Sequence, residues 1–528
     1  MARKLKPTPV TTPKRITAEA EVRPSREERR ADRQLRERFA PRQGWGGRFS
    51  GRASVEDAGA VYTGPSTQAG GIFPWLLGSG LPPRGVPVGR DVLTGELVCV
   101  DPAGWTGSLT TNPGVYLISQ PGAGKSALVK RICLVYSSYG HMVCVPGDPK
   151  GEYSALVREL GGSVVRIGDG IGRLNPLDSG PLKSVLHTLP ADRRASLRDT
   201  LNARRQDALV ALLGTKHGLG RIPDEVERSA LTTAVRIAAD TLGETTDPVV
   251  SDVVRVLRAA PEALLAKLSA PEAEFRKLTR SVVAGLDNLI DGPLKGLFDG
   301  PTTVPLDIDA PAVSVDISAL RSRGSDVEAA GMIATWAYTY SAIDSARSIG
   351  MLQRPLVLPM DEMWRALRAG PGMVDAMDSI SRLNRQYSDV AIYVTHSLLD
   401  GESLATETDR AKARGLMDRC DTLIIGASSS DELTRISSKR PLTEQERMMI
   451  GSWSSATSTG LDVTPSTQTD GDGKPVEQNR HPGRGKYMIK VGSRPGVAAA
   501  MELTATERRL YHTDPEQRRK MKTTEAAS

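Results

Sequence analysis

The sequence predicts an α/β fold with a mainly parallel central sheet, and three features of the 528-residue chain indicate it. Short apolar runs alternate with helical segments in two separate stretches, which is typical of parallel sheets. A stretch with only helical periodicity interrupts them, and a basic, polar arm precedes them. No apolar run approaches the roughly 20 residues that cross a bilayer, and no secretory signal follows the basic N-terminus. We therefore expect a cytoplasmic protein built from several packed units.

The arm comprises residues 1–60. Its first 50 residues hold fourteen Lys or Arg against six Asp or Glu, a net charge of +8, whereas the whole chain carries +7. Large apolar residues are scarce, so the arm cannot bury enough surface to fold alone, and we expect disorder. Recurring Glu and Arg in residues 16–39 favour a charged helix within it. Two interpretations stay open: a solvated tail, or a contact for acidic lipid, nucleic acid or a partner protein.

The elements before residue 181 alternate in the α/β manner. Residues 61–113 are predicted to form a β-hairpin that leads into the first part of the α/β unit, residues 114–180. The expected elements are strands at 86–88, 97–100 and 114–118, a helix at 125–139, and strands at 142–145 and 164–167.

Residues 181–300 lose the strand pattern. Val249, Val253, Val256 and Leu257 fall on one helical face after a start signal at Asp247. This stretch is therefore predicted as an all-helical insertion.

The α/β pattern resumes in residues 301–512, and the polar tail at 513–528 is expected to fray. The expected elements are strands at 312–317, 356–360, 390–394 and 422–425, a helix at 329–343, and a final β-pair at 486–491 and 497–503. Pro359 removes a donor from a predicted central strand, which predicts a bulge there.

The segment from Ser119 to Ser126 reads SQPGAGKS, and it follows an apolar run and opens a predicted helix. This is the context of a phosphate-binding loop, in which glycines let backbone N–H groups turn around the phosphates and the helix N-terminus adds positive potential. Lys125 adds a mobile charge, and Ser126 can ligate magnesium. The strict motif has Gly at position 119, a mismatch that leaves the GAGKS core intact. The residues expected to bind nucleotide are Pro121, Gly122, Ala123, Gly124, Lys125, Ser126 and Ala127.

An acidic pair follows the apolar run in RPLVLPMDEMW. Asp361 is expected to hold magnesium, directly or through water, and Glu362 to polarise the attacking water as a general base. The loop and the acidic pair together predict hydrolysis of a nucleoside triphosphate, with ATP and Mg²⁺ as the expected ligands.

Two further groups of residues are candidates for sensing or completing hydrolysis. Thr395 and His396 end the next apolar run, where a polar side chain can contact the γ-phosphate; a simple cap is the alternative. Arg382 and Arg385, three residues apart on a predicted helix, can reach a neighbouring subunit's nucleotide or be ordinary surface arginines.

The loop PGDPKGEY follows the predicted strand at 142–145. It presents Asp148, Lys150 and Glu152 at the carboxyl end of the sheet, where ligands of open α/β sheets bind. These side chains line either the site or a subunit interface.

Seven motifs, taken in order, resemble those of the conjugative-transfer ATPases of type IV secretion systems, the TraC/TrbE-type traffic ATPases of the HerA/FtsK superfamily. The motifs are GAGKS, DPKGEY, RLNPLD, GLFDGPT, VSVDISAL, MDEMW and GRGKYMIKVG. The resemblance implies a RecA-like P-loop NTPase with a helical insertion, assembled as a homo-oligomeric and often hexameric ring. It also implies that the ring lies beside secretion-channel components at the cytoplasmic face of the inner membrane. There ATP hydrolysis would energise channel or pilus assembly and substrate transfer.

By position, the resemblance implies that Lys125 and Ser126 bind phosphate and magnesium. It also implies that Asp361 and Glu362 form the acidic pair. His396 stands where the family more often has Gln. The family usually carries a substantial N-terminal docking domain, whereas only the basic arm precedes the α/β unit here.

Two other functions remain open. A DNA translocase or coupling ATPase of the same superfamily would pump DNA through the ring. A nucleotide-dependent scaffold would bind ATP without useful turnover, and the presence of Glu362 argues against it.

Overall fold

The computed structural model describes Arg26 and residues 80–511, apart from positions 169, 244, 363–364, 366–386, 405 and 455–482. The chain divides into two units, Met1–Pro74 and Trp75–Ser528, and the strands and helices named below belong to the second. The predictions for the basic arm, for Arg382 and Arg385, and for the polar tail lie outside the described residues.

Eleven strands of the described residues form one sheet, in the order β2-β1-β11-β10-β9-β3-β8-β7-β4-β6-β5. The neighbours from β9 to β5 run parallel, and the pairs from β2 to β9 are antiparallel. The predicted mainly parallel sheet is thus confirmed, and both predicted hairpins join its antiparallel end. The strands are β1 (Val86–Asp91), β2 (Leu97–Val100), β3 (Val115–Ile118), β4 (Met142–Asp148), β5 (Ser163–Arg166), β6 (Ala312–Asp316), β7 (Leu356–Met360), β8 (Val390–Thr395), β9 (Thr422–Ile425), β10 (Lys486–Val491) and β11 (Val497–Ala500).

Helices cover both faces of the sheet because successive strand residues point to opposite sides. Val115 and Leu117 of β3 share a core with α4 and α5, whereas Tyr116 and Ile118 share the other core with α12, α16, α17 and α18. The helices before the insertion are α3 (Pro102–Trp105), α4 (Lys125–Ser138) and α5 (Ser154–Glu159). Those after it are η2 (Ser318–Arg323), α12 (Ser325–Ser348), α15 (Leu399–Glu402), α16 (Glu407–Asp418), α17 (Ser430–Lys439), α18 (Glu444–Ser454) and α19 (Ala505–Leu510).

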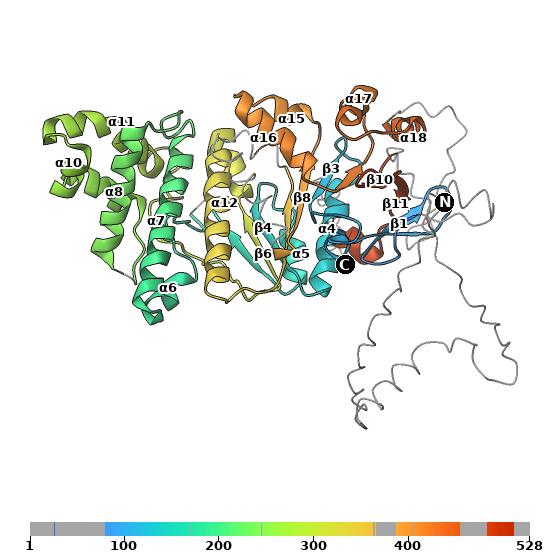
Figure 1. Ribbon diagram of the computed structural model, residues 1–528, viewed down its shortest axis with the longest axis horizontal. Coiled ribbons are helices and arrows are strands. Elements are labelled where there is room, and N and C mark those ends of the chain that lie inside the picture. The colour runs from blue at the N-terminus through green and yellow to red at the C-terminus, as the bar shows by residue number, and fades with distance from the viewer. Residues whose placement is uncertain are drawn as a thin grey trace, which may run out of the picture. The chain divides into compact units, whose positions relative to one another are not determined.

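The helical stretch predicted between the two α/β parts is present between β5 and β6. It consists of α6 (Leu182–Val185), η1 (Leu186–Thr188), α7 (Ala191–Leu213), α8 (Glu225–Leu242), α9 (Val250–Ala259), α10 (Glu262–Leu268) and α11 (Glu272–Asp291). Figure 1 shows these helices on the far side of α12 from the sheet. Arg204 of α7 donates to Asp344 of α12 at 2.9 Å. In α9, Val253 and Leu257 are buried as the predicted apolar face requires.

The prediction of a bulge at Pro359 is wrong. The register between β7 and β8 is unbroken from Val357 to Met360. Pairing on the other side, with β4, is confined to Leu356 and Val357. Pro146 of β4 also lacks an N–H, so the ladder between the two strands ends before both prolines. The backbone beyond this point leads into the loops that carry Lys150 and Asp361.

None of the helices in the described part of the chain combines the length and the apolar character that a membrane span requires.

Candidate nucleotide-binding site

The loop between β3 and α4 has the backbone geometry of a phosphate cradle. Gly122 and Gly124 have φ angles of +81° and +99°, a region that L side chains rarely adopt. A Cβ on Gly124 would also lie 2.8 Å from the Tyr487 hydroxyl. Lys125 is the first residue of α4, so the loop opens onto a helix N-terminus. The two glycines of GAGK are thus required by backbone conformation, and Gly124 also by the approach of Tyr487 from β10.

The antiparallel end of the sheet braces this loop. The carbonyl of Ala123 accepts from the Gly485 N–H at 2.9 Å, and the Gln120 N–H donates to the carbonyl of Ala427 at 2.8 Å. Gly485 lies in the motif GRGKYMIKVG, so the structure gives that motif a role in holding the loop.

Ser119, the mismatch to the strict motif, is compatible with this geometry. Its φ is not among the positive values of the described residues, so the position does not need glycine. The side chain is buried and its hydroxyl donates to the Ala427 carbonyl at 3.3 Å. Gly426 makes room for it, because a Cβ there would clash with the Ser119 hydroxyl.

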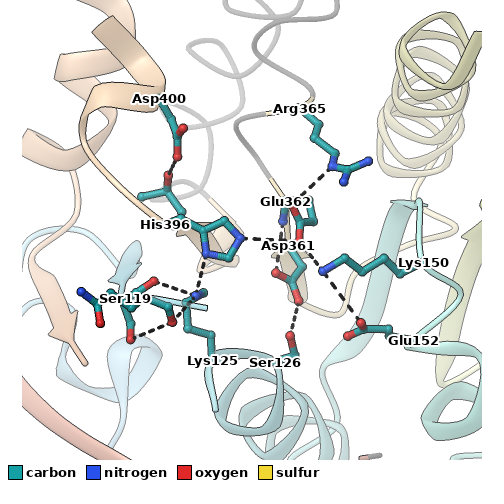
Figure 2. A network of polar contacts seen from close by, with 12 residues as sticks. Ser119, Lys125, Ser126, Lys150, Glu152, Asp361, Glu362, Arg365, His396 and Asp400 are labelled. Carbon is teal, nitrogen blue, oxygen red and sulfur yellow. Dashed lines mark hydrogen bonds and ion pairs between the residues drawn. The ribbon is translucent and has the colours of Figure 1, made fainter. Parts of the chain in front are cut away.

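Lys125 is buried at the centre of the site (Figure 2). Its ammonium donates to the carbonyls of Ser119 and Gln120 at 2.7 and 3.0 Å and lies 2.8 Å from His396 Nδ1. A charged ammonium only donates, so we assign His396 Nδ1 as the acceptor and place the imidazole proton on Nε2. Burial lowers the pKa of Lys125 to about 8, although Asp361 and Glu362 oppose the shift.

Ser126 and Asp361 meet although they are 235 residues apart in the chain. The Ser126 hydroxyl, at the start of α4, donates to Asp361 Oδ2 at 2.8 Å. The Tyr153 hydroxyl donates to the same oxygen at 3.2 Å. A hydroxyl and a carboxylate are hard oxygen ligands of the type Mg²⁺ takes, so the pair predicted to hold magnesium has suitable chemistry.

Glu362 is 5% exposed and lies among three cationic or hydrogen-bonding side chains. Lys150 forms an ion pair with Oε1, His396 Nε2 lies 3.7 Å from the same oxygen, and Arg365 Nε lies 3.4 Å from Oε2. Burial alone would raise the pKa of Glu362, but hydrogen bonds from His396 and Lys150 lower it well below the usual range. The backbone of Glu362 has a φ of +58°, a strained left-handed conformation for a residue with a side chain.

The loop that follows β4 lies against both acidic residues. Asp148 accepts from the N–H groups of Lys150 and Tyr153 at 3.1 and 2.8 Å, so it shapes the loop. Burial raises the pKa of Asp148. Glu152 lies 3.9 Å from both Lys130 and Lys150, and burial raises its pKa too. Lys150 then contacts Glu362, while Tyr153 contacts Asp361.

Of the two predicted sensor residues, only His396 contacts Lys125. The Thr395 hydroxyl donates to Asp400 Oδ2 at 2.9 Å and lies 3.1 Å from the Ser397 carbonyl, an arrangement that fits the alternative of a cap. The structure thus brings together Lys125, Ser126, Asp361, Glu362 and His396.

Three contacts of the site were not predicted from the sequence. They involve Lys150 with Glu362, Tyr153 with Asp361, and Arg365 with Glu362. The loop motif pointed to this edge of the sheet, but no spacing in the sequence identified the partners.

No protein-family model and no curated protein sequence matches the chain. Among solved structures, VirB4 of Thermoanaerobacter pseudethanolicus is similar, with a TM-score of 0.57 and 20% identity over 80% of this chain and 97% of that one. This chain has the VirB4 fold. The bacterial conjugative coupling protein TrwB also matches, with a TM-score of 0.45 and 12% identity over 74% of this chain and 86% of that one. A TrwB structure in complex with ADP and Mg²⁺ matches with a TM-score of 0.44. The predicted resemblance is therefore borne out for the fold, which this chain shares with VirB4.

Proposed function

We propose that this chain is an ATPase motor that energises conjugative transfer or type IV secretion. The observation that carries the proposal is the 2.8 Å hydrogen bond between Ser126 and Asp361, which joins the phosphate-binding loop to the acidic pair. Lys125 and Glu362 lie beside this contact. The VirB4-like fold supports secretion as the pathway.

The residues divide the chemistry among themselves. The backbone of residues 121–127 and the Lys125 ammonium bind the ATP phosphates. Ser126 and Asp361 would hold Mg²⁺, and the bound ion would supply positive charge for the transferred phosphoryl group. Glu362 accepts a proton from the attacking water once one of its oxygens is available. His396 lies between Lys125 and Glu362, with Nδ1 accepting from Lys125 and Nε2 3.7 Å from Glu362 Oε1.

The assembly follows the same proposal. The chain forms a homo-oligomeric ring at the cytoplasmic face of the inner membrane, beside channel components. The ring is hexameric, as is often the case in the family that the sequence resembles. Arg382 or Arg385 reaches the neighbouring subunit's nucleotide and stabilises transition-state charge. The basic arm of residues 1–60 contacts acidic lipid or nucleic acid.

ATP hydrolysis by the purified full chain, with and without single-stranded or duplex DNA at moderate salt, tests this function. A secretion motor is expected to hydrolyse ATP at a rate that DNA changes little. Strong stimulation by DNA would instead favour a DNA translocase of the same fold. ATP binding without turnover would favour a nucleotide-dependent scaffold.

A further inference from the structure

Lys150 is the most exposed of the three side chains that contact Glu362, at 34% against 30% for His396 and 28% for Arg365. We propose that Lys150 is a positioning residue that restrains Glu362, and that hydrolysis is faster once the Lys150–Glu362 ion pair opens. The inference rests on the proposed ATPase function and deepens it, because it identifies what controls the general base.

Both carboxylate oxygens of Glu362 are engaged. Oε1 pairs with Lys150 and lies 3.7 Å from His396 Nε2, while Oε2 lies 3.4 Å from Arg365 Nε (Figure 2). A general base must offer a free lone pair to the water whose proton it takes. The carboxylate has about four lone-pair sites, so these contacts leave room for a water, but the close ion pair with Lys150 makes Glu362 a weaker base.

The other two partners are held from elsewhere. Arg365 also pairs with Glu328 in the first turn of α12, at 2.7 Å. His396 is fixed by its 2.8 Å contact with Lys125. The other ion pair of Lys150 is with Glu152 at 3.9 Å, which is long for a hydrogen bond.

Lys150 can leave Glu362 without unfolding its loop. Its side chain is 34% exposed, so the ammonium remains close to solvent when the pair opens. Asp148 holds the backbone of the loop through Lys150 and Tyr153, so a rotamer change of one flexible side chain is sufficient.

An arriving triphosphate supplies the competing charge. The negative charge of its phosphates weakens the hold of Glu362 on the Lys150 ammonium, which turns toward solvent without binding the phosphates directly. The left-handed backbone of Glu362 is strained, so the conformation depends on the surrounding contacts and can relax when they open. The arrangement therefore ties activation of the base to occupation of the phosphate site.

Steady-state hydrolysis and binding of a fluorescent ATP analogue by the full chain test the restraint. Lys150→Met is expected to raise kcat by about tenfold, with KM and nucleotide Kd changed by less than about twofold. Lys150→Arg keeps the charge and should restore the wild-type rate. Lys295→Met, which removes an exposed ammonium in the helical insertion, is the matched control and should leave all three constants unchanged. If Lys150→Met does not fold, Lys150→Gln is the equivalent variant.

The outcomes separate the two proposals. An active wild type with a Lys150→Met variant that is equally fast or slower would overturn the restraint alone. Nucleotide binding weakened tenfold or more would also overturn it, because Lys150 would then be a phosphate ligand. If the wild type and Lys150→Met were both inactive, the proposed ATPase function would fail together with the restraint.

Discussion

Two buried glutamates, Glu362 and Glu507, have similar burial but different surroundings. They are 5% and 6% exposed. Burial tends to raise the pKa of each carboxyl, but cationic partners lower both pKa values below the ordinary range. The pKa values of the two carboxyls are therefore shifted in the same direction.

The partners of the two carboxylates differ in rigidity. Glu507 accepts two hydrogen bonds of 2.6 Å from the guanidinium of Arg131, and it closes a capping box with Thr504. Arg131 also donates to the Val88 carbonyl at 2.8 Å, and its side chain is 9% exposed.

Glu362 instead has three separate partners, Lys150, His396 and Arg365, which are 34%, 30% and 28% exposed. The buried Arg131–Glu507 pair therefore ties α4 to α19, whereas the partners of Glu362 are partly exposed and, in our proposal, can separate from it during a reaction.

Loss of the Glu362 carboxylate should have the largest effect on activity. Glu362→Gln is expected to lower kcat about 1,000-fold because the general base is removed, while ATP binding and the melting temperature stay close to wild type. Steady-state hydrolysis and thermal unfolding measure the two quantities. A variant that turned over at the wild-type rate would remove Glu362 from the reaction.

The matching change at Glu507 should affect stability instead. Glu507→Gln leaves the buried Arg131 without a counter-charge, so the free energy of unfolding is expected to fall by about 3 kcal/mol. The folded fraction should hydrolyse ATP within about twofold of the wild-type rate. Denaturant unfolding gives the stability. A stable variant with a large loss of kcat would contradict the distinction between the two glutamates.

The charge of Lys125 should make nucleotide binding depend on pH. The pKa of Lys125 in the free protein is about 8, below its ordinary value of 10.5, and bound phosphate favours the ammonium form. Nucleotide affinity is therefore expected to be highest below pH 8. Above pH 8 the affinity falls, and the decrease approaches about tenfold per pH unit. Fluorescence titration with nucleotide on both sides of pH 8 measures this. Lys125→Arg, which stays charged, should bind with an affinity that is flat over the same range.

The smallest expected effect is at Ser119. Within the described part of the chain its hydroxyl bonds to the carbonyls of Gln120 and Ala427, so Ser119→Gly should cost about 1 kcal/mol or less of stability and leave kcat within about twofold. Thermal unfolding and hydrolysis assays check both. A large loss of activity would show that this serine takes part in the site after all.

The sequence was sufficient for the elements whose signal is local. Apolar runs such as Leu356–Met360 predicted core strands, and SQPGAGKS predicted the phosphate loop because its glycines meet a backbone requirement. Asp361 and Glu362 were predicted because a P-loop needs acids at the end of a core strand.

The remaining features depend on partners far apart in the chain. Lys150 and Glu362 are both ordinary charged residues, and only the order β8-β7-β4 places their loops together. A bulge was predicted at Pro359 because the sequence does not show that the pairing of β7 with β4 ends at Val357, before the proline. Thr395 and His396 are adjacent, yet their side chains have different partners, Asp400 and Lys125.

Hydrolysis of ATP by wild-type protein and by Lys125→Ala, measured side by side with and without Mg²⁺, is the decisive test of nucleotide hydrolysis at this loop. Mg²⁺-dependent turnover is expected from the wild type and none above background from Lys125→Ala, with both proteins folded. Equal hydrolysis by the two proteins would contradict the assignment of residues 119–126 as the catalytic phosphate-binding loop.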